Sequence, residues 1–115
     1  MVYFKRFIVV IEIPVLLSLP SQNTVSEGSP FRLLCQSSGG TKPVFFQWIK
    51  NGNILVNSPE SDYKIENNDE YSLFTFKNVD RSDSGNYSCI ARNTFGTDIQ
   101  SALLTVKGCQ LSYFE

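Results

Sequence analysis

The chain has 115 residues, a hydrophobic content of 42%, a charged content of 18% and a formal net charge of −1. This length suits one hydrophobic core but not two, and the composition is that of a globular rather than a disordered protein. The near-zero charge and the lack of a basic cluster argue against a nucleic-acid partner, because phosphate binding needs grouped Lys and Arg. The chain has no histidine, and so lacks the usual general base at neutral pH and the commonest metal ligand.

The N-terminal segment is apolar and has two interpretations. Residues 7–19 are mostly apolar and follow two basic residues, as at the start of a secretory signal peptide. However, an acidic residue and a proline interrupt the run, and no small-residue cleavage site follows it. The stretch is also shorter than the about 20 residues that span a bilayer. We therefore expect residues 13–19 to form the first strand, and residues 1–12 to be a leader or N-terminal extension.

The next segments are short, alternate between apolar and polar residues, and are separated by turn residues, which indicates antiparallel strands. If Cys35 points inward, then so do Phe31 and Leu33, because successive strand side chains point to opposite faces. Asn51-Gly52 predicts a tight turn, and residues 93–96 predict a hairpin into the last strand. The same alternation predicts a set of inward side chains along the later strands: Val44, Phe46, Trp48, Tyr63, Ile65, Phe74, Phe76, Val79, Tyr87, Cys89, Ala91, Ala102, Leu104 and Val106.

One constellation of residues is more specific than the strand pattern. Cys35 and Cys89 are 54 positions apart, Trp48 follows the first cysteine by 13 positions, and Tyr87 stands two positions before the second. With these residues, residues 13–106 resemble an immunoglobulin domain of the intermediate set. The resemblance implies an all-β, immunoglobulin-like antiparallel β-sandwich with Greek-key connections over residues 13–107. It also implies a Cys35–Cys89 disulfide between the sheets with Trp48 packed beside it, and a Tyr87 hydroxyl bonded to upstream backbone.

The cysteines also bear on location. A persistent disulfide implies an oxidising compartment, and therefore secretion. Together with the family resemblance, it predicts an extracellular domain at the cell surface of the plasma membrane. Cys109 is left over: it either belongs to a linker or fragment end, or it pairs with another chain. Residues 108–115 are expected to be a C-terminal extension or linker, which leads into a following domain or is an artefact of the gene model. We expect one module of a larger receptor, attached to a membrane only through segments absent from this chain.

The position that should pair with Asp83 departs from the family pattern. The family usually places an arginine at the foot of the Tyr63 strand, paired with the aspartate equivalent to Asp83. Here Asp62 occupies that position and Lys64 is the nearest cation, which puts the ion pair in question. We expect Asp83 instead to accept backbone N–H groups at its turn.

The sequence offers no arrangement for catalysis. Serine and aspartate are plentiful, but without histidine no positioned base activates a nucleophile, so we predict no enzyme, no cofactor and no metal site. Three acids, Glu66, Asp69 and Glu70, lie around a predicted hairpin loop, and Asp62 lies before the strand that leads into it. We interpret them as solvated side chains, with a carboxylate pair or a weak calcium site as the less favoured alternatives.

The outward side chains carry the functional prediction. Leu34 and Leu73 point outward on strands that are neighbours in the four-stranded sheet of this fold. An apolar centre with a rim of both charge signs is typical of a protein interface. The predicted interface comprises Arg32, Leu34, Lys64, Glu66, Tyr71, Leu73 and Thr75.

The other sheet offers a competing face. Phe45, Ile90 and Leu103 also point outward on neighbouring strands. Beside them lies the sequon Asn86-Tyr87-Ser88, and a glycan on Asn86 would shield this face. The alternative for both faces is that they bind nothing, since scattered surface hydrophobes are normal.

A narrower resemblance selects among these functions. Several phrases are similar to variable domains of the Down syndrome cell adhesion molecule (Dscam)-like proteins, whose domains bind identical copies across cell contacts. The resemblance therefore implies homophilic cell adhesion by another copy of the domain on an apposed cell. The alternatives are a heterophilic receptor or secreted immune-recognition domain that uses loops 37–42 and 93–97, or an intracellular muscle-type repeat with reduced cysteines. The phrases that carry the likeness are residues 25–28, 43–52, 78–79, 84–89 and 91–93.

Overall fold

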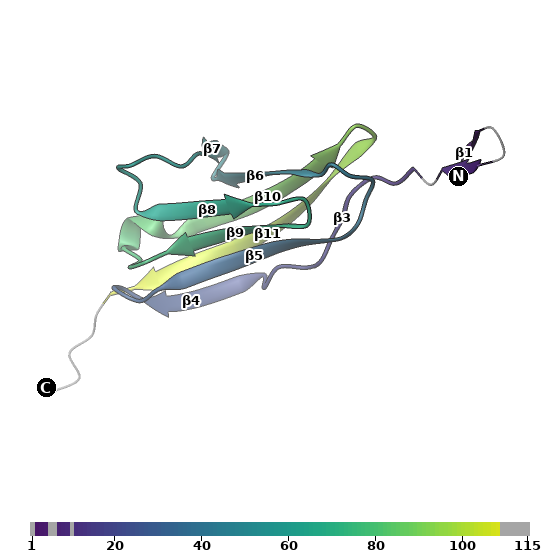
Figure 1. The fold of residues 1–115 in the computed structure, drawn as a ribbon. Coiled ribbons are helices and arrows are strands. Elements are labelled where there is room, and N and C mark those ends of the chain that lie inside the picture. The colour runs from purple at the N-terminus through teal and green to yellow at the C-terminus, as the bar shows by residue number, and fades with distance from the viewer. Residues whose placement is uncertain (1, 5–6, 10, 109–115) are drawn as a thin grey trace, which may run out of the picture.

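The computed structural model describes residues 2–4, 7–9 and 11–108, with side chains from residue 11 onward. Two packed sheets form a sandwich (Figure 1). The four-stranded sheet has the order β3 (Val15–Leu16), β5 (Phe31–Gly39), β9 (Tyr71–Phe76), β8 (Tyr63–Asn67). The five-stranded sheet has the order β4 (Gln22–Ser26), β11 (Gly96–Lys107), β10 (Gly85–Asn93), β6 (Phe45–Lys50), β7 (Asn53–Leu55). A separate two-stranded sheet pairs β1 (Val2–Phe4) with β2 (Phe7–Val9), and a single 3-10 turn, η1 (Arg81–Asp83), precedes β10.

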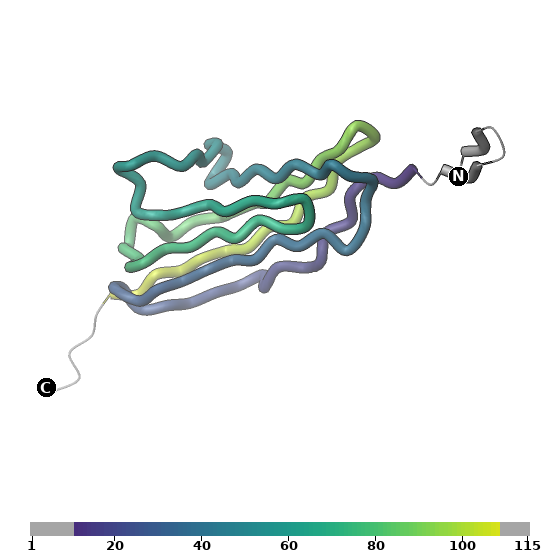
Figure 2. Tube along the Cα trace, viewed as in Figure 1, coloured from purple at the N-terminus to yellow at the C-terminus, as the bar shows by residue number. Residues whose placement is uncertain are grey.

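The expected first strand is divided between the two sheets. Instead of one strand over residues 13–19, β3 pairs antiparallel with β5, and the chain then crosses to the other layer (Figure 2), where β4 pairs parallel with β11. Pro20 lies at the crossing. Proline has no backbone N–H to donate to a neighbouring strand, so the pairing cannot continue through it. Leu19 is buried beside it. The prediction of one continuous strand was therefore wrong, although its apolar residues do enter the sandwich.

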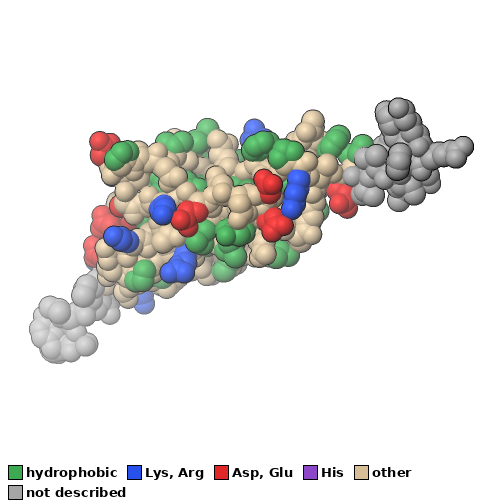
Figure 3. Space-filling view, viewed as in Figure 1, with side chains coloured by type: hydrophobic (Ala, Val, Ile, Leu, Met, Phe, Trp, Pro, Cys, Tyr) green, Lys and Arg blue, Asp and Glu red, His purple; other side chains and the backbone are tan. Residues whose placement is uncertain are grey.

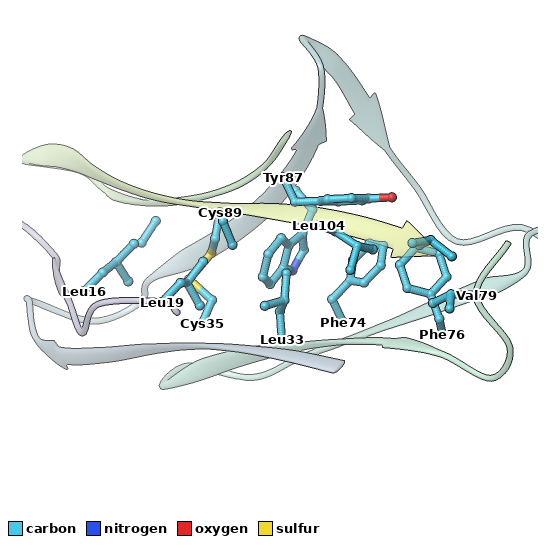
Figure 4. Packing of buried hydrophobic residues seen from close by; sticks show 14 of the residues in the cluster. Leu16, Leu19, Leu33, Cys35, Phe74, Phe76, Val79, Tyr87, Cys89 and Leu104 are labelled. Carbon is cyan, nitrogen blue, oxygen red and sulfur yellow. A yellow bond between two sulfur atoms is a disulfide. The ribbon is translucent and has the colours of Figure 1, made fainter. Parts of the chain in front are cut away.

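The interior lies between the two sheets, as the alternation predicted. Leu33, Cys35, Phe74 and Phe76 project from one layer toward Tyr87, Cys89 and Leu104 of the other (Figure 4). Burying each large apolar side chain contributes about 1.5–3 kcal/mol. Most of the residues predicted to point inward are fully buried; Phe31, Phe46, Tyr63 and Ile65 are half-buried and pack against the core.

A disulfide joins the two layers at the centre of this interior. Cys35 of β5 is bonded to Cys89 of β10, with their Cα atoms 6.4 Å apart. Trp48 of β6 stands opposite Cys89 in the β6–β10 register and is completely buried. Its ring centroid lies 5.3 Å from that of Phe74 in the facing sheet. The bridge and the indole that the resemblance implied are thus both found at the middle of the sandwich.

A buried serine completes the hydrogen bonding of the tryptophan. The indole Nε1–H of Trp48 donates to Oγ of Ser72 over 2.7 Å, and the Ser72 hydroxyl donates in turn to Oδ1 of Asn67. Ser72 is fully buried on the inner side of β9. Because an unsatisfied buried donor costs about 1–3 kcal/mol, this serine is as much a part of the core as the rings around it.

The predicted tight turn is present between β6 and β7. Asn51 and Gly52 both have positive φ, at 48° and 89°, and Lys50 pairs with Asn53 across the turn. Positive φ at both central residues gives a two-residue turn whose twist matches that of the strands it joins, and Asn-Gly is the preferred sequence for it. The hairpin at residues 93–96 between β10 and β11 is also confirmed.

The tyrosine corner is formed as the resemblance implied. The Tyr87 hydroxyl donates to the carbonyl oxygen of Asp83. The Asp83 carboxylate accepts from the backbone N–H of Asp80 over 2.8 Å, as predicted, and the Asp80 carboxylate accepts from the N–H of Arg81, so that the two aspartates cap η1 reciprocally. Among the described residues, no cation forms an ion pair with Asp83. Burial raises the pKa of its carboxyl above the usual value.

Candidate recognition surfaces

The outer surface of β5, β9 and β8, with Leu17 beside it, is named here the four-strand face. Leu34 is paired with Leu73 across β5 and β9, and Leu73 is paired with Glu66 across β9 and β8. Leu34 is 47% exposed and Leu73 is half-buried. The two leucines that the sequence analysis placed together are therefore direct cross-strand neighbours, within contact range for side chains on one face.

A second row of the four-strand face lies two residues from the first: two residues earlier on β5 and β8, and two residues later on the antiparallel β9. Arg32 is paired with Thr75, and Thr75 is paired with Lys64. Lys64 Nζ lies 3.0 Å from Oε2 of Glu66, which stands in the first row. Figure 3, seen with β5, β8 and β9 in front, shows hydrophobic side chains gathered near the middle of this surface with charged side chains of both signs around them. Tyr71, also exposed, is paired with Gln36 in a third row.

Leu17 extends the apolar centre and was missed from the sequence. Its backbone N–H donates to the carbonyl oxygen of Gln36 over 2.9 Å, which places it at the edge of β5. Leu16 is buried and Leu17 is exposed, so the two point to opposite sides. Strand alternation along residues 13–19 predicts an outward Leu17 only if Leu16 is known to point inward, and the sequence does not say which of the two is buried.

The charged end of the four-strand face adjoins a shallow hollow of about 580 Å³. Lys64 and Thr75 contribute to its wall from the outer side of the sheet. A concave border next to an apolar centre suits the insertion of side chains from a protein partner better than a flat sheet does. The remaining lining residues are Ser61, Asp62, Tyr63, Lys77 and Asn78.

The outer surface of β11, β10, β6 and β7 is named here the five-strand face. Ile90 of β10 lies between Ile99 of β11 and Gln47 of β6 in the strand register. Ile99 is 51% exposed and Phe45 is 63% exposed, so this face also presents apolar groups to solvent. Ile99 was not singled out from the sequence, although it follows the same alternation as Leu103. Asn86 is exposed on this face and is paired with Leu103.

The loops at one end of the sandwich are joined by hydrogen bonds. The Asn93 side-chain amide Nδ2 donates to the carbonyl oxygens of Thr41 and Glu12, over 2.9 and 2.7 Å. Its Oδ1 accepts from the N–H groups of Phe95 and Gly96 in its own hairpin. Residues 37–42 and 93–97 therefore lie at the same end of the sandwich, as the heterophilic alternative requires. The predicted loop 37–42 is shorter than expected, because residues 37–39 continue β5. No short-range sequence pattern predicted that Asn93 connects the two segments.

Two of the acids considered for calcium are paired with lysines. Glu66 pairs with Lys64, and Glu70 pairs with Lys42 over 3.0 Å. Among the residues with described side chains, no three His, Cys, Asp or Glu residues lie close enough to hold a metal ion. In the same part of the chain, no helix has the length and hydropathy needed to cross a membrane. Cys109, and with it the choice between a linker cysteine and one paired with another chain, lies outside the described residues.

Two curated relatives are receptor and adhesion proteins by name. The chain is 35% identical over 94 residues to the tyrosine-protein kinase receptor TYRO3 of Mus musculus. This alignment covers 81% of the chain and 11% of the relative. The chain is also 35% identical over 83 residues to neural cell adhesion molecule 1 of Rattus norvegicus, in an alignment that covers 72% of the chain and 10% of the relative. The chain thus spans about a tenth of the length of these relatives.

Solved structures and a family model agree on the fold. A three-domain titin fragment superposes with a TM-score of 0.76 at 27% identity, over 86% of this chain and 34% of that one. The Dscam1 Ig7 domain superposes with a TM-score of 0.76 at 21% identity, over 83% of this chain and 97% of that one, and at that identity the likeness shows the fold alone. The family model "Immunoglobulin domain" matches residues 13–93. This chain therefore belongs to the immunoglobulin domain family.

Proposed function

We propose that this chain is an extracellular recognition module for cell adhesion, and that it binds a second copy of itself through the four-strand face. The observation that carries the proposal is the Leu34–Leu73 pair, flanked by Arg32, Lys64 and Glu66 on the same surface. An apolar centre with charges of both signs around it can serve both halves of a symmetric contact. The receptor and adhesion proteins among the relatives support this class of function.

The charges indicate one arrangement of the two copies. Leu34, Leu73 and Glu66 form one row across the sheet, and Arg32, Thr75 and Lys64 form the next. If two faces meet about a two-fold axis that lies midway between these rows and parallel to them, each row faces the other row of the partner. Glu66 of each copy then opposes Lys64 of the other, twice in the dimer. An axis on the leucine row would instead oppose Glu66 to itself, which like-charge repulsion disfavours.

The contact is expected to be weak. One face of one small sandwich is expected to bury less than the about 800 Å² that each partner contributes to a standard stable interface. Adhesion by such a module depends on several domains or many molecules acting together, because linked contacts raise the effective concentration of each other. A weak single contact also allows the charged rim to decide which copies bind, because a mismatch places like charges opposite each other.

Sedimentation of charge variants tests the arrangement. Lys64→Glu and Glu66→Lys should each lose self-association by about tenfold or more, a change of about 1.4 kcal/mol, because each puts like charges in both symmetric positions. A mixture of the two variants should associate, since every opposed pair is then of opposite sign. The double variant should also self-associate but should not bind wild type. All proteins should carry Cys109→Ser, so that no intermolecular disulfide contributes.

Two aspartate variants separate the faces. Leu73→Asp, in the centre of the four-strand face, should abolish self-association, whereas Ile99→Asp, at a similarly outward position on the five-strand face, should leave it unchanged. Thermal unfolding of each variant confirms that it folds. Wild-type protein that stays monomeric at its highest soluble concentration would contradict self-recognition, and a loss seen only with Ile99→Asp would assign it to the other sheet.

A second candidate function is heterophilic binding through the end loops, which Asn93 favours because it holds loops 37–42 and 93–97 together. Replacing the exposed Phe95 with Ser should then abolish binding to a cell-surface ligand while leaving sedimentation unchanged.

A muscle-type intracellular repeat is the third candidate, favoured by the titin superposition. Mass spectrometry of native material distinguishes it, because an oxidised Cys35–Cys89 pair requires the secretory route.

A further inference from the structure

The outer side of β10 carries the acceptor sequence for an N-linked glycan, Asn86-Tyr87-Ser88. Tyr87 and Cys89 are buried between the sheets, so Asn86 and Ser88 point to the outer side of the same strand. Asn86 is exposed. The acceptor amide and the hydroxyl of the sequon therefore lie on one face that solvent reaches.

The fold does not use the side chain of Asn86. The backbone N–H of Asn86 donates to Oδ1 of Asn51 and its carbonyl oxygen accepts from the Asn51 N–H, each over 3.0 Å. In residues 11–108 the Asn86 side-chain amide takes part in no hydrogen bond of the structure. The hydroxyl of Ser88 lies 2.8 Å from that of Ser101, on the same outer face. A sugar on Nδ2 of Asn86 would break none of these contacts.

Exposed apolar side chains lie near Asn86 on the five-strand face. Leu103, 43% exposed, is directly across β11 from Asn86, and Ile99 lies further along the same strand on the same face. Exposed apolar patches on a sheet invite unspecific contact unless something covers them. The hydrocarbon sides of a pyranose ring can pack on such groups while its hydroxyls remain in water.

We propose that Asn86 carries an N-linked glycan whose first sugars lie over Leu103 and shield the five-strand face. In the transfer, Nδ2 of Asn86 bonds to the anomeric carbon of an oligosaccharide carried on a lipid diphosphate. The bond from that carbon to the diphosphate oxygen breaks, the lipid diphosphate leaves, and the amide gives up one proton. The glycan stands on the opposite side of the sandwich from Leu34 and Leu73, so it leaves the four-strand face open. This inference goes beyond self-recognition, and neither depends on the other.

Secretion of the whole chain tests the modification. The chain should be fused to a cleavable secretion signal, produced in animal cells, and weighed before and after treatment with peptide N-glycosidase. Wild type is expected to lose mass, and treatment in heavy-oxygen water should label position 86 as aspartate. Asn86→Gln and Ser88→Ala should remove the glycosidase-sensitive mass, and Ser88→Thr should keep it. If Asn86→Gln is not secreted, the two Ser88 variants decide the question.

Secreted, oxidised wild type with the bare peptide mass would overturn the proposal, as would a glycan that persists in Asn86→Gln. Shielding has its own measurement: removing the glycan from folded protein should increase the fluorescence of an apolar dye, and Leu103→Ser should reduce that increase. Equal dye binding before and after glycan removal would show that the glycan does not cover this face. Self-association is measured on unglycosylated protein made in a bacterial periplasm, so its failure is distinguishable from the failure of this proposal.

Discussion

The two outer faces of the sandwich are both apolar, but they differ in what surrounds the apolar groups. On the four-strand face, Leu34 and Leu73 sit next to a row that contains Arg32 and Lys64. On the five-strand face, Ile90 lies between Ile99 and Gln47, neither of which is charged, and Phe45 lies beside a single sign of charge, that of Arg92. Apolar exposure alone would therefore not distinguish the faces. Charges of both signs do, because they orient a partner and exclude mismatched ones.

The first prediction removes the feature on which both faces depend. Replacing Cys35 and Cys89 together with Ala should lower the free energy of unfolding by about 2–5 kcal/mol, because the open chain gains conformational freedom that the bridge denies it. Urea unfolding of the double variant and wild type measures the loss. A loss below about 1 kcal/mol would mean that the layers are held together by packing around Trp48 rather than by the bridge. Cys109→Ser is the matched control and should leave the unfolding free energy unchanged.

The second prediction tests the side of β9 that faces inward, opposite to Leu73. Ser72→Ala leaves the indole N–H of Trp48 without an acceptor, and should cost about 1–3 kcal/mol of stability. Thermal or urea unfolding measures it, with Ser26→Ala, an exposed strand position, as the matched control. If Ser72→Ala matches that control, water or another group must satisfy the indole. The outcome also separates a core change from one at Leu73, which should affect association.

The alternation along the strands was predictable because a strand has period two, and one inward residue fixes all the others. Because Cys35 points inward, its neighbour Leu34 must point outward. The inward position of Trp48 places its own neighbours outward in the same way. The Asn51-Gly52 turn was predictable because its conformation is set by those two residues alone. Such local rules therefore account for the sides of the sandwich and for the outward position of the predicted interface residues.

Pairing across the sheets was not predictable in the same way. Pro20 predicts that a strand stops, but not that the chain crosses to the other sheet. That crossing depends on whether the other sheet has an edge strand without a partner, here β11. Leu16 donates its backbone N–H to the Asp98 carboxylate, 82 residues later, and Asn93 bonds to Thr41 and Glu12. These partners are set by the packed arrangement, since no short-range pattern connects residues so far apart in sequence.

The third prediction concerns the pH dependence of stability that the buried Tyr87 phenol of β10 confers. Burial, with the nearby Asp83 carboxylate, raises the pKa of the Tyr87 phenol above its ordinary value of 10.0. The folded state therefore keeps this proton while the unfolded chain loses it, so the stability from Tyr87 is complete below pH 10 and declines above it. The slope for one proton is about 1.4 kcal/mol per pH unit.

Urea unfolding between pH 9 and pH 11.5, in the Cys109→Ser background, checks that decline. Tyr87→Phe should be less stable than wild type at pH 8, by about 0.5–1.5 kcal/mol for the lost hydrogen bond to Asp83, and its profile should fall less steeply above pH 10. Tyr71→Phe changes an exposed ring and should keep the wild-type slope. Equal slopes for Tyr87→Phe and wild type would show that the phenol titrates in the folded protein as it does in the unfolded chain.

The smallest expected effect concerns the charges of the four-strand face in the monomer. The Lys64–Glu66 pair is exposed, with 71% and 52% of the side-chain areas open to solvent, so exchanging the two residues should change the unfolding free energy by less than about 1 kcal/mol. Urea unfolding at low protein concentration measures this, with Lys42→Glu/Glu70→Lys, an exposed pair away from the leucines, as the matched control. A larger loss in the Lys64/Glu66 exchange would mean that the pair supports the fold. A loss no larger than the control's means that these charges contribute little to the monomer, so a change in association after charge reversal can be assigned to the contact between copies.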